Sequence, residues 1–245
     1  MQPEIFKNEL ASLIKARTRR SKPCIIALPV NQVLHKTLPI MPGLSTTELE
    51  DHIQREAGAV LPAKMTDIIW DYCFIPGKNE ISVTLAQPDN VMTYVELFNA
   101  CGLNLKVIDV DSYALARVWR ASYPEFACTA NLYGIALLRT QSITMALVHK
   151  QSVLVARSLP CVGSENVSSL LTQLISSLPL NPDLPSLKHV WLAGECATPD
   201  QVSVLENLLN IPVEIVKFGE NFHGAAALDA AKLFLNIGIA LWGKC

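Results

Sequence analysis

The sequence predicts a mixed α/β protein in which an antiparallel meander is extended by parallel strands, with a second α/β segment ahead of it. Short β-rich runs alternate with amphipathic helical stretches, as they do in sheets covered by helices. Three β runs between residues 132 and 158 are joined by short polar turns, which is typical of a meander. Of the 245 residues, 50% are hydrophobic, and this is enough for a sizeable packed core.

The first 32 residues are expected to hold a helix from about Ile5 to Ala16 and a strand from Cys24 to Val30. No three-strand meander precedes these two elements, so this half of the fold is expected to be incomplete. A basic cluster lies between them and fits a solvated helix end, because cations are favourable at a helix C-terminus. The cluster comprises Lys15, Arg17, Arg19, Arg20 and Lys22.

Residues 45–62 predict a helix with defined ends. Ser45 and Glu48 fit a capping box, in which each side chain accepts from the backbone N–H of the other residue. Pro62 lacks an N–H and should end the helix. Apolar residues recur between these ends at helical spacing and should face a core, namely Leu49, Ile53, Ala57 and Val60.

Residues 33–104 are expected to form a compact α/β insert around this helix. Its other elements are strands at Val33–Leu38, Ile68–Phe74 and Ile81–Ala86 and a helix at Asn90–Ala100. Asp71 interrupts a run of β-branched and aromatic residues, so we expect it on a solvent face or at a sheet edge. Asp89 is expected to cap the last helix, and Gly102 to end it.

A strand at Lys106–Val110 and a helix at Ser112–Arg120 then return to the first half, so residues 1–32 and 105–122 are grouped together. Asp109 and Asp111 lie at the end of that strand. Residues 123–245 follow the order β-β-β-α-β-α-β-α. The strands are Leu132–Leu138, Ile143–His149, Ser152–Ser158, His189–Gly194 and Pro212–Lys217, and the helices are Asn166–Leu178, Asp200–Asn210 (capped by Thr198) and Gly224–Trp242.

Three antiparallel strands extended by two parallel ones through right-handed crossovers form a ribonuclease H-like unit. Two such halves around a cleft make the actin-like fold. We therefore predict an actin-like fold whose first half is incomplete and carries the insert at residues 33–104.

Composition excludes several functional classes. The net charge is −2 and no long basic run exists, so a dedicated nucleic-acid binder is not expected. No apolar run is long enough to span a bilayer, and the first residues lack the apolar core of a signal peptide, so we expect a cytoplasmic protein. The seven cysteines form no C-x-x-C pair and the five histidines are scattered, which favours neither a metal site, a disulfide framework nor a catalytic triad.

Four phrases of the chain have an order and spacing typical of a known family, namely IIALPVNQVLHKTLPI, ELEDHIQREAGAVLPAKMTDIIWDY, AQPDNVMTYVELFNACGLNLKVIDVDSYALARVW and SVLVARSLPCVG. They resemble PilM, the actin-like cytoplasmic protein of type IV pilus assembly, and are most similar to its HofM branch, which is associated with DNA utilization and competence. A helix ending in Leu-Pro and then a strand carrying Asp-Tyr are a recurring phrase of the family's inserted subdomain.

The resemblance also implies departures at the nucleotide site. PilM relatives carry a glycine-containing turn in a first meander, which this chain lacks. Their second meander opens with Asp-[Ile/Leu]-Gly, whose glycine lets backbone N–H groups approach phosphate. The matching position here reads Leu137-Leu138-Arg139, and the glycine-rich adenosine turn reads Gly194-Glu195-Cys196. Gly194 is thus the one vestige of a cofactor site, and no cofactor is expected.

The resemblance implies a non-catalytic adaptor that binds the cytoplasmic tail of a PilN-like or HofN-like bitopic membrane protein and reaches the inner membrane only through such partners. Leu28, Val33 and Leu38 are candidate walls of a partner groove, although their apolar side chains fit a buried core equally well. Two alternatives stay open: an actin-like ATPase using ATP and Mg²⁺, and a truncated relative without independent function. The residues expected to shape the scaffold are Glu56, Leu61, Pro62, Asp71, Gly102 and Asp109.

Overall fold

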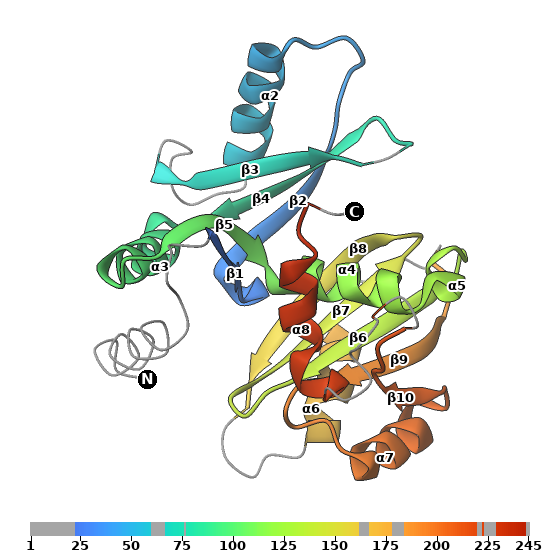
Figure 1. The fold of residues 1–245 in the computed structure, drawn as a ribbon. Helices are drawn as coiled ribbons and strands as arrows, with labels where there is room; N and C mark the ends of the chain where they lie inside the picture. Colours follow the sequence, from blue (N-terminus) through green and yellow to red (C-terminus); the bar gives the residue numbers. More distant parts are fainter. Residues whose placement is uncertain are drawn as a thin grey trace. The chain divides into compact units, whose positions relative to one another are not determined.

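The computed structural model describes residues 23–59, 67–75, 77–161, 167–177, 184–219, 222 and 229–243. The chain divides into two compact units, of residues 1–26 with 32–108 and of residues 27–31 with 109–245. The boundary falls within strands β1 (Pro23–Leu28) and β5 (Asn104–Val110), which pair with each other (Figure 1). The assignment of residues 1–32 and 105–122 to one incomplete ribonuclease H-like half stays a prediction.

The first unit contains an antiparallel sheet in the order β2-β4-β3. Its strands are β2 (Val33–Pro39), β4 (Glu80–Ala86) and β3 (Ile69–Phe74), and helix α2 (Thr46–Gly58) packs on one face. These are the strands and the helix predicted for the insert. Strand β4 lies in the centre, which explains why nearly all of its side chains are buried.

Helix α2 begins as its sequence predicts. The Ser45 hydroxyl accepts from the Glu48 N–H at 3.3 Å, and the Glu48 carboxylate accepts from the Ser45 N–H at 2.8 Å. Leu49, Ile53 and Ala57 are buried in one stripe against the sheet. The helix ends at Gly58, with Ala59 as its C-cap, which is earlier than the predicted stop at Pro62. Val60, Leu61 and Pro62 themselves lie outside the described residues.

Strand β3 alternates between the two faces of the sheet. Trp70 and Tyr72 are half-buried and pack against the core under α2, whereas Asp71 is exposed. Because β3 is an outer strand of its sheet, the predicted solvent-face or edge position of Asp71 is confirmed.

Helix α3 (Pro88–Ala100) corrects one prediction and confirms another. Asp89 is not its cap: the helix begins at Pro88, which needs no N–H partner in the first turn, and Gln87 occupies the cap position. Gly102 ends the helix with a left-handed φ of +69°. The Gly102 and Leu103 N–H groups donate to the carbonyls of Asn99 and Phe98, which is a Schellman motif.

The second unit contains a five-stranded sheet in the order β10-β9-β6-β7-β8. Strands β6, β7 and β8 are antiparallel, whereas β9 pairs parallel to β6, and β10 parallel to β9. This is the predicted meander with two parallel extensions. The bounds are β6 Leu132–Leu138, β7 Ser142–His149, β8 Ser152–Pro160, β9 Leu187–Ala193 and β10 Val213–Ile215.

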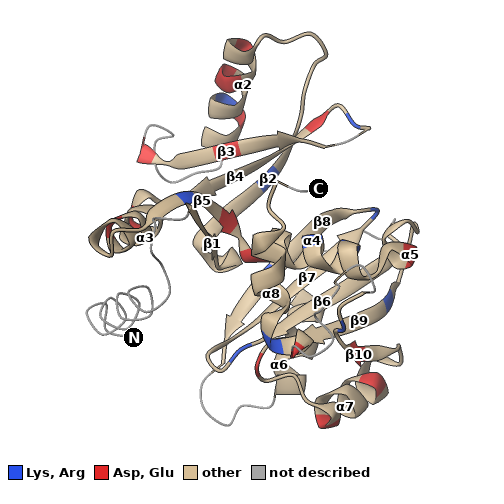
Figure 2. Ribbon diagram, viewed as in Figure 1, with Lys and Arg blue, Asp and Glu red and all other residues tan. Residues whose placement is uncertain are grey.

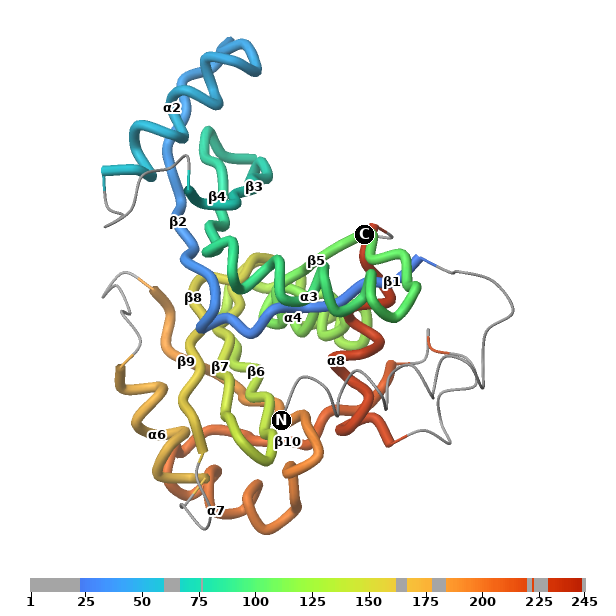
Figure 3. The backbone as a smooth tube through the Cα atoms, turned by 90° about the vertical axis from the view of Figure 1, so that its left-hand side faces the viewer, coloured from blue at the N-terminus to red at the C-terminus, as the bar shows by residue number. Residues whose placement is uncertain are grey.

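Helices cover both faces of this sheet (Figures 1 and 3). On one face α6 (Val167–Ser177) and α7 (Pro199–Leu209) bury leucines against β6, β7 and β9. On the other, α4 (Asp111–Ser122) and α8 (Ala230–Ala240) pack around Trp119, Trp191 and Phe234. The sheet is therefore a central layer buried on both sides.

Several short features were not predicted. Strand β1 ends at Leu28 rather than Val30, because a 3₁₀ turn occupies Val30–Gln32. A single helical turn, α5 (Pro124–Ala127), follows α4. The last helix, α8, begins at Ala230 and not at the predicted Gly224, because Asp229 is its N-cap and its carboxylate accepts from the Lys232 N–H. Among the described residues, no helix is long and apolar enough to cross a membrane.

The buried stripe of α2 makes a testable prediction about stability. Ile53 is fully buried and Gln54 is exposed. We expect Ile53→Ala to lower the free energy of unfolding by about 2–5 kcal/mol, because it leaves a cavity. Gln54→Ala is the matched control and should change it by less than about 0.5 kcal/mol. Urea denaturation measures both values, and equal losses would place the stripe on the wrong face.

Candidate functional site

The turn between β6 and β7 carries Arg139, at the position where the sequence resemblance implies a phosphate-binding glycine. Two of its backbone N–H groups, those of Arg139 and Thr140, donate hydrogen bonds within the chain. The Arg139 N–H donates to the Ser142 carbonyl at 2.9 Å, which closes the hairpin. The Thr140 N–H and hydroxyl donate to one Glu195 carboxylate oxygen at 3.0 and 3.3 Å. A carboxylate from the turn after β9 therefore accepts from the β6–β7 turn, as a bound anion would.

Gly194 has a steric role at the end of β9. Its φ is +102°, and a Cβ at this position would lie 2.1 Å from the Leu138 carbonyl oxygen. Its N–H donates to the Ala231 carbonyl at 2.7 Å, which ties β9 to the start of α8. The Cys196 N–H donates to the Leu138 carbonyl at 3.2 Å. Close packing against β6 accounts for this glycine, and its N–H is already used within the chain.

Asp111 is the most buried carboxylate of this region, with 1% of its side chain exposed. It accepts from the Val30 N–H at 3.1 Å and from the Arg139 guanidinium at 3.5 Å. Burial raises the pKa of Asp111 to about 6, although the Arg139 charge and the two backbone N–H groups of Val30 and Ser112 act in the opposite direction. The buried site thus favours the protonated form of Asp111 more than water does.

Arg139 lies in the field of two carboxylates. Besides its pairing with Asp111, its charge acts on Glu195. Burial alone would raise the pKa of Glu195, but the hydrogen bonds from Thr140 and the Arg139 charge together lower it. One guanidinium therefore faces two carboxylates, and an added phosphate at this turn would meet repulsion that the single cation does not fully offset.

Asp109 belongs to the framework around this site. Its carboxylate accepts from the Val110 N–H at 2.8 Å and from Arg117 at 2.9 Å. Arg117 also donates to the Gly238 carbonyl at 2.7 Å. Gly238 itself packs so closely on α4 that a Cβ there would lie 2.1 Å from the Ala114 oxygen. The ion pair thus joins the end of β5 to α4, and the Arg117–Gly238 hydrogen bond joins α4 to α8.

In the first unit, the expected scaffold residues are at separate positions. Glu56 is exposed on α2, and its carbonyl oxygen accepts from the Lys36 ammonium at 2.8 Å, near the negative end of the helix dipole. The exposed Asp71 carboxylate accepts from the adjacent Tyr72 N–H at 2.8 Å. Gly102 ends α3, and Leu61 and Pro62 lie outside the described residues. Their roles as family scaffold stay predictions.

The three candidates for a partner groove differ in exposure and in unit. Leu28 is 3% exposed and belongs to the second unit, whereas Leu38 is 2% exposed in the core of the first. Val33 is half-buried at the start of β2. Only Val33 offers surface to a partner, so the placement of Leu28 and Leu38 favours a core role for both.

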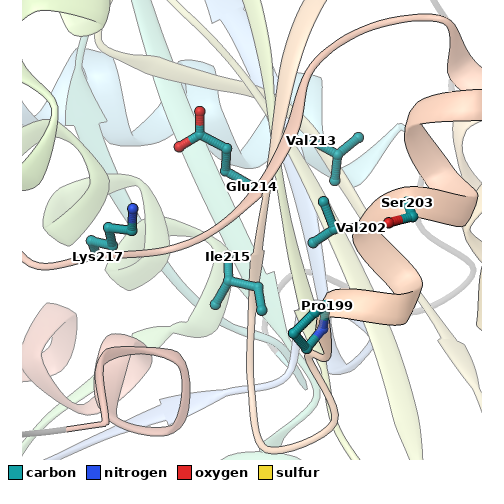
Figure 4. A pocket seen from close by; sticks show the side chains of 7 residues that line it. All are labelled: Pro199, Val202, Ser203, Val213, Glu214, Ile215 and Lys217. Atoms are coloured by element: carbon teal, nitrogen blue, oxygen red, sulfur yellow. The ribbon is translucent and has the colours of Figure 1, made fainter.

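A shallow pocket of about 350 Å³ lies between α7 and β10 (Figure 4). Aliphatic side chains from the helix and the strand gather there, with Glu214 and Lys217 to one side. It brings together none of the residues singled out in the sequence. The full lining is Pro199, Val202, Ser203, Val213, Glu214, Ile215 and Lys217.

The sequence identified the β6–β7 turn and the turn after β9 as candidate sites, but it did not predict the contacts that these turns make. The pairings of Glu195 with Thr140 and of Arg139 with Asp111 join segments 55 and 28 residues apart. The available signal was the charged residues Arg139 and Glu195 at positions where the sequence resemblance implies glycine. Among the described residues, no group of three or more His, Cys, Asp or Glu side chains is arranged to hold a metal ion.

Comparison with known proteins places these features in a family context. A family model described as type IV pilus assembly protein PilM matches residues 2–177. A chain of a PilM–PilN type IV pilus biogenesis complex superposes with a TM-score of 0.74 at 18% identity, covering 98% of this chain and 85% of the other. At such identity the superposition supports the fold alone.

Two further solved structures share the fold. A protein of unknown function with an actin-like ATPase fold, from Bacteroides thetaiotaomicron, has a TM-score of 0.52 at 12% identity, covering 95% of this chain and 79% of its own. The cytoplasmic domain of EpsL, an inner membrane component of the type II secretion system of Vibrio cholerae, has a TM-score of 0.53 at 11% identity, covering 87% and 72%. The predicted actin-like fold is confirmed.

The buried carboxylate makes a prediction about pH. The pKa of Asp111 is about 6 when folded and near its ordinary 3.8 when unfolded, so the native state binds this proton more tightly. Between pH 4 and 6 this group therefore lowers the free energy of unfolding as pH rises, by at most about 1.4 kcal/mol per pH unit. Asp111→Asn does not titrate at this position.

Urea denaturation of both proteins across this window measures the effect. The free energy of unfolding of the wild type, relative to that of Asp111→Asn, should fall as the pH rises from about 4 to about 6. All other carboxylates are present in both proteins, so their titration cancels in this difference. Parallel pH profiles for the two proteins would show that Asp111 is not held in a proton-binding environment.

Proposed function

The chain belongs to the PilM family of type IV pilus assembly proteins, and from this premise we propose that it is a non-catalytic adaptor that binds the cytoplasmic tail of a PilN-like membrane protein. Such a tail would hold it at the cytoplasmic face of the inner membrane. The family match over residues 2–177 supports the assembly role, and the similar PilM chain comes from a complex with PilN. The HofM-like phrases of the sequence extend the proposal to a HofN-like partner and to DNA uptake.

The hydrogen bonding of the β6–β7 turn to the chain's own Glu195 is the observation that supports the non-catalytic part of the proposal. Phosphoryl transfer needs backbone N–H groups and cations that are free to hold the phosphates. Here Glu195 accepts from the Thr140 N–H and hydroxyl, and Arg139 is paired with Asp111. The residues do not fit a nucleotide phosphate, since the ligand would have to displace one carboxylate and lie near another.

Partner binding is the direct test of the adaptor role. We expect the full-length PilN-like protein to co-purify with this chain. A peptide of its cytoplasmic tail should bind with a micromolar Kd, which corresponds to a binding free energy of roughly −8 kcal/mol. A short disordered ligand loses conformational entropy on binding, which limits its affinity. A scrambled peptide of the same composition is the control. Failure of both the full-length partner and its tail to bind a folded sample would leave the proposal without support.

Nucleotide binding is the second test. Isothermal titration calorimetry with Mg-ATP should give no binding at micromolar concentrations, and phosphate release should not exceed that of the buffer. The physical reason is the repulsion between the nucleotide phosphates and the carboxylates of Asp111 and Glu195. A micromolar Kd for Mg-ATP, or turnover above the buffer rate, would support the ATPase alternative.

A further inference from the structure

The two outer strands of the first unit's sheet are protected to different degrees. Strand β2 carries Lys36 and Pro39, which are typical of strands that must not pair with other chains. Strand β3 contains neither lysine nor proline. Instead Ile69 is 40% exposed and Phe74 is 61% exposed. Strand β3 is therefore a partly apolar edge whose one charged residue is Asp71.

The backbone register shows which groups of β3 point away from the sheet. The Ile75 N–H donates to the Glu80 carbonyl at 3.0 Å, just beyond the last pair of the β3–β4 ladder. Bonding residues alternate along an antiparallel strand, so Asp71 and Cys73 bond to β4 as Ile75 does. The N–H and C=O groups of Trp70, Tyr72 and Phe74 then point outward. We call this row of outward groups the β3 edge.

Asp71 supports this assignment. Its carboxylate accepts from the Tyr72 N–H at 2.8 Å, which requires that this N–H is not bonded to β4. Within the part of the chain that the structure describes, no strand pairs with the outer side of β3. Asp71 thus shields one outward donor in the free protein, and its exposed charge is available to a cation.

The side chains beside the β3 edge define what an added strand would meet. Trp70, Tyr72 and Phe74 form an aromatic row on the α2 face, with ring centroids 6.3 and 6.0 Å apart. Ile69, Asp71 and Cys73 lie on the opposite face. An added strand would place alternate side chains on these two faces, so apolar residues would extend the aromatic row and a basic residue would face Asp71.

The charge around the β3 edge favours a basic ligand. Strand β3 has one acidic residue and no basic one. Helix α2, which covers the aromatic face, carries four acidic residues and only Arg55 as a basic one (Figure 2). A second copy of this chain would bring Asp71 and the acidic α2 near their own equivalents, which like-charge repulsion disfavours.

We infer that the β3 edge binds, by strand addition, an extended segment in which apolar residues alternate with Lys or Arg, and that this segment is the membrane-proximal stretch of the partner's cytoplasmic tail. The inference rests on the proposed function. Cytoplasmic segments next to a membrane span carry an excess of Lys and Arg, which matches the charge of this surface. Main-chain hydrogen bonds would supply affinity, and the alternating side chains would supply specificity.

Charge reversal tests the surface. The probe is a peptide of the 15 residues that precede the membrane span of the PilN-like partner, titrated in about 0.15 M salt. Asp71→Lys should weaken binding at least tenfold without lowering the melting temperature, because Asp71 is exposed. Glu96→Lys is the matched control: it makes the same charge change at an exposed position of α3 in the same unit and should alter the Kd less than twofold.

N-methylation of the peptide tests strand addition itself. In an added strand only alternate N–H groups donate to β3. Methylation of one set of alternate residues should abolish binding, whereas methylation of the other set should leave the Kd within about threefold. Equal effects of the two sets, or equal Kd values for the wild type and Asp71→Lys, would overturn the inference.

The full-length partner separates this inference from the proposed function. If the partner binds the wild type and Asp71→Lys equally well, the adaptor role stands and the β3 edge is not its docking site. If the partner binds the wild type and Asp71→Lys weakens it at least tenfold, the inference is supported even where the isolated peptide is too weak to measure. If the partner binds neither protein, both the adaptor role and this docking site are overturned.

Discussion

The contact of Arg139 with Asp111, together with the nearby Glu195–Thr140 hydrogen bonds, is the constraint on which the second unit's polar site depends. It joins the β6–β7 turn, the turn after β9 and the start of α4. A buried carboxylate such as Asp111 is costly unless it is paired or protonated. Arg139 supplies the pairing, and the Val30 N–H adds a second partner. Charges of this chain thus occupy a place where the resemblance to PilM relatives implies approach of a phosphate.

Close backbone packing holds the same region from the other side. Gly194 lies against Leu138 and donates to the carbonyl of Ala231 at the start of α8. Further along α8, Gly238 lies against Ala114, and Arg117 donates to its carbonyl. These contacts tie β6, β9, α4 and α8 together, so the polar turns are supported by a rigid, well-packed sheet.

The sequence predicted the elements that local rules determine and missed contacts that depend on distant residues. Ser45 and Glu48 identified the start of α2, and Gly102 identified the end of α3, because capping uses neighbours in sequence. Asp89 was misplaced because the helix begins at Pro88, two residues before the predicted Asn90, so Gln87 occupies the cap position. The Arg139–Asp111 contact could not be predicted, since it needs the register of a turn and a helix 28 residues away. The β3 edge likewise emerged only from the ladder with β4.

Binding of the partner is therefore expected to be independent of nucleotide. If the β6–β7 turn holds the chain's own carboxylate, Mg-ATP has no site through which to change the affinity for the partner. The most direct measurement is the Kd of the full-length PilN-like protein for this chain, determined with and without millimolar Mg-ATP. The account predicts the same micromolar or tighter value in both conditions. A tenfold or larger change on adding nucleotide would contradict it, because linkage would then require that the chain binds ATP.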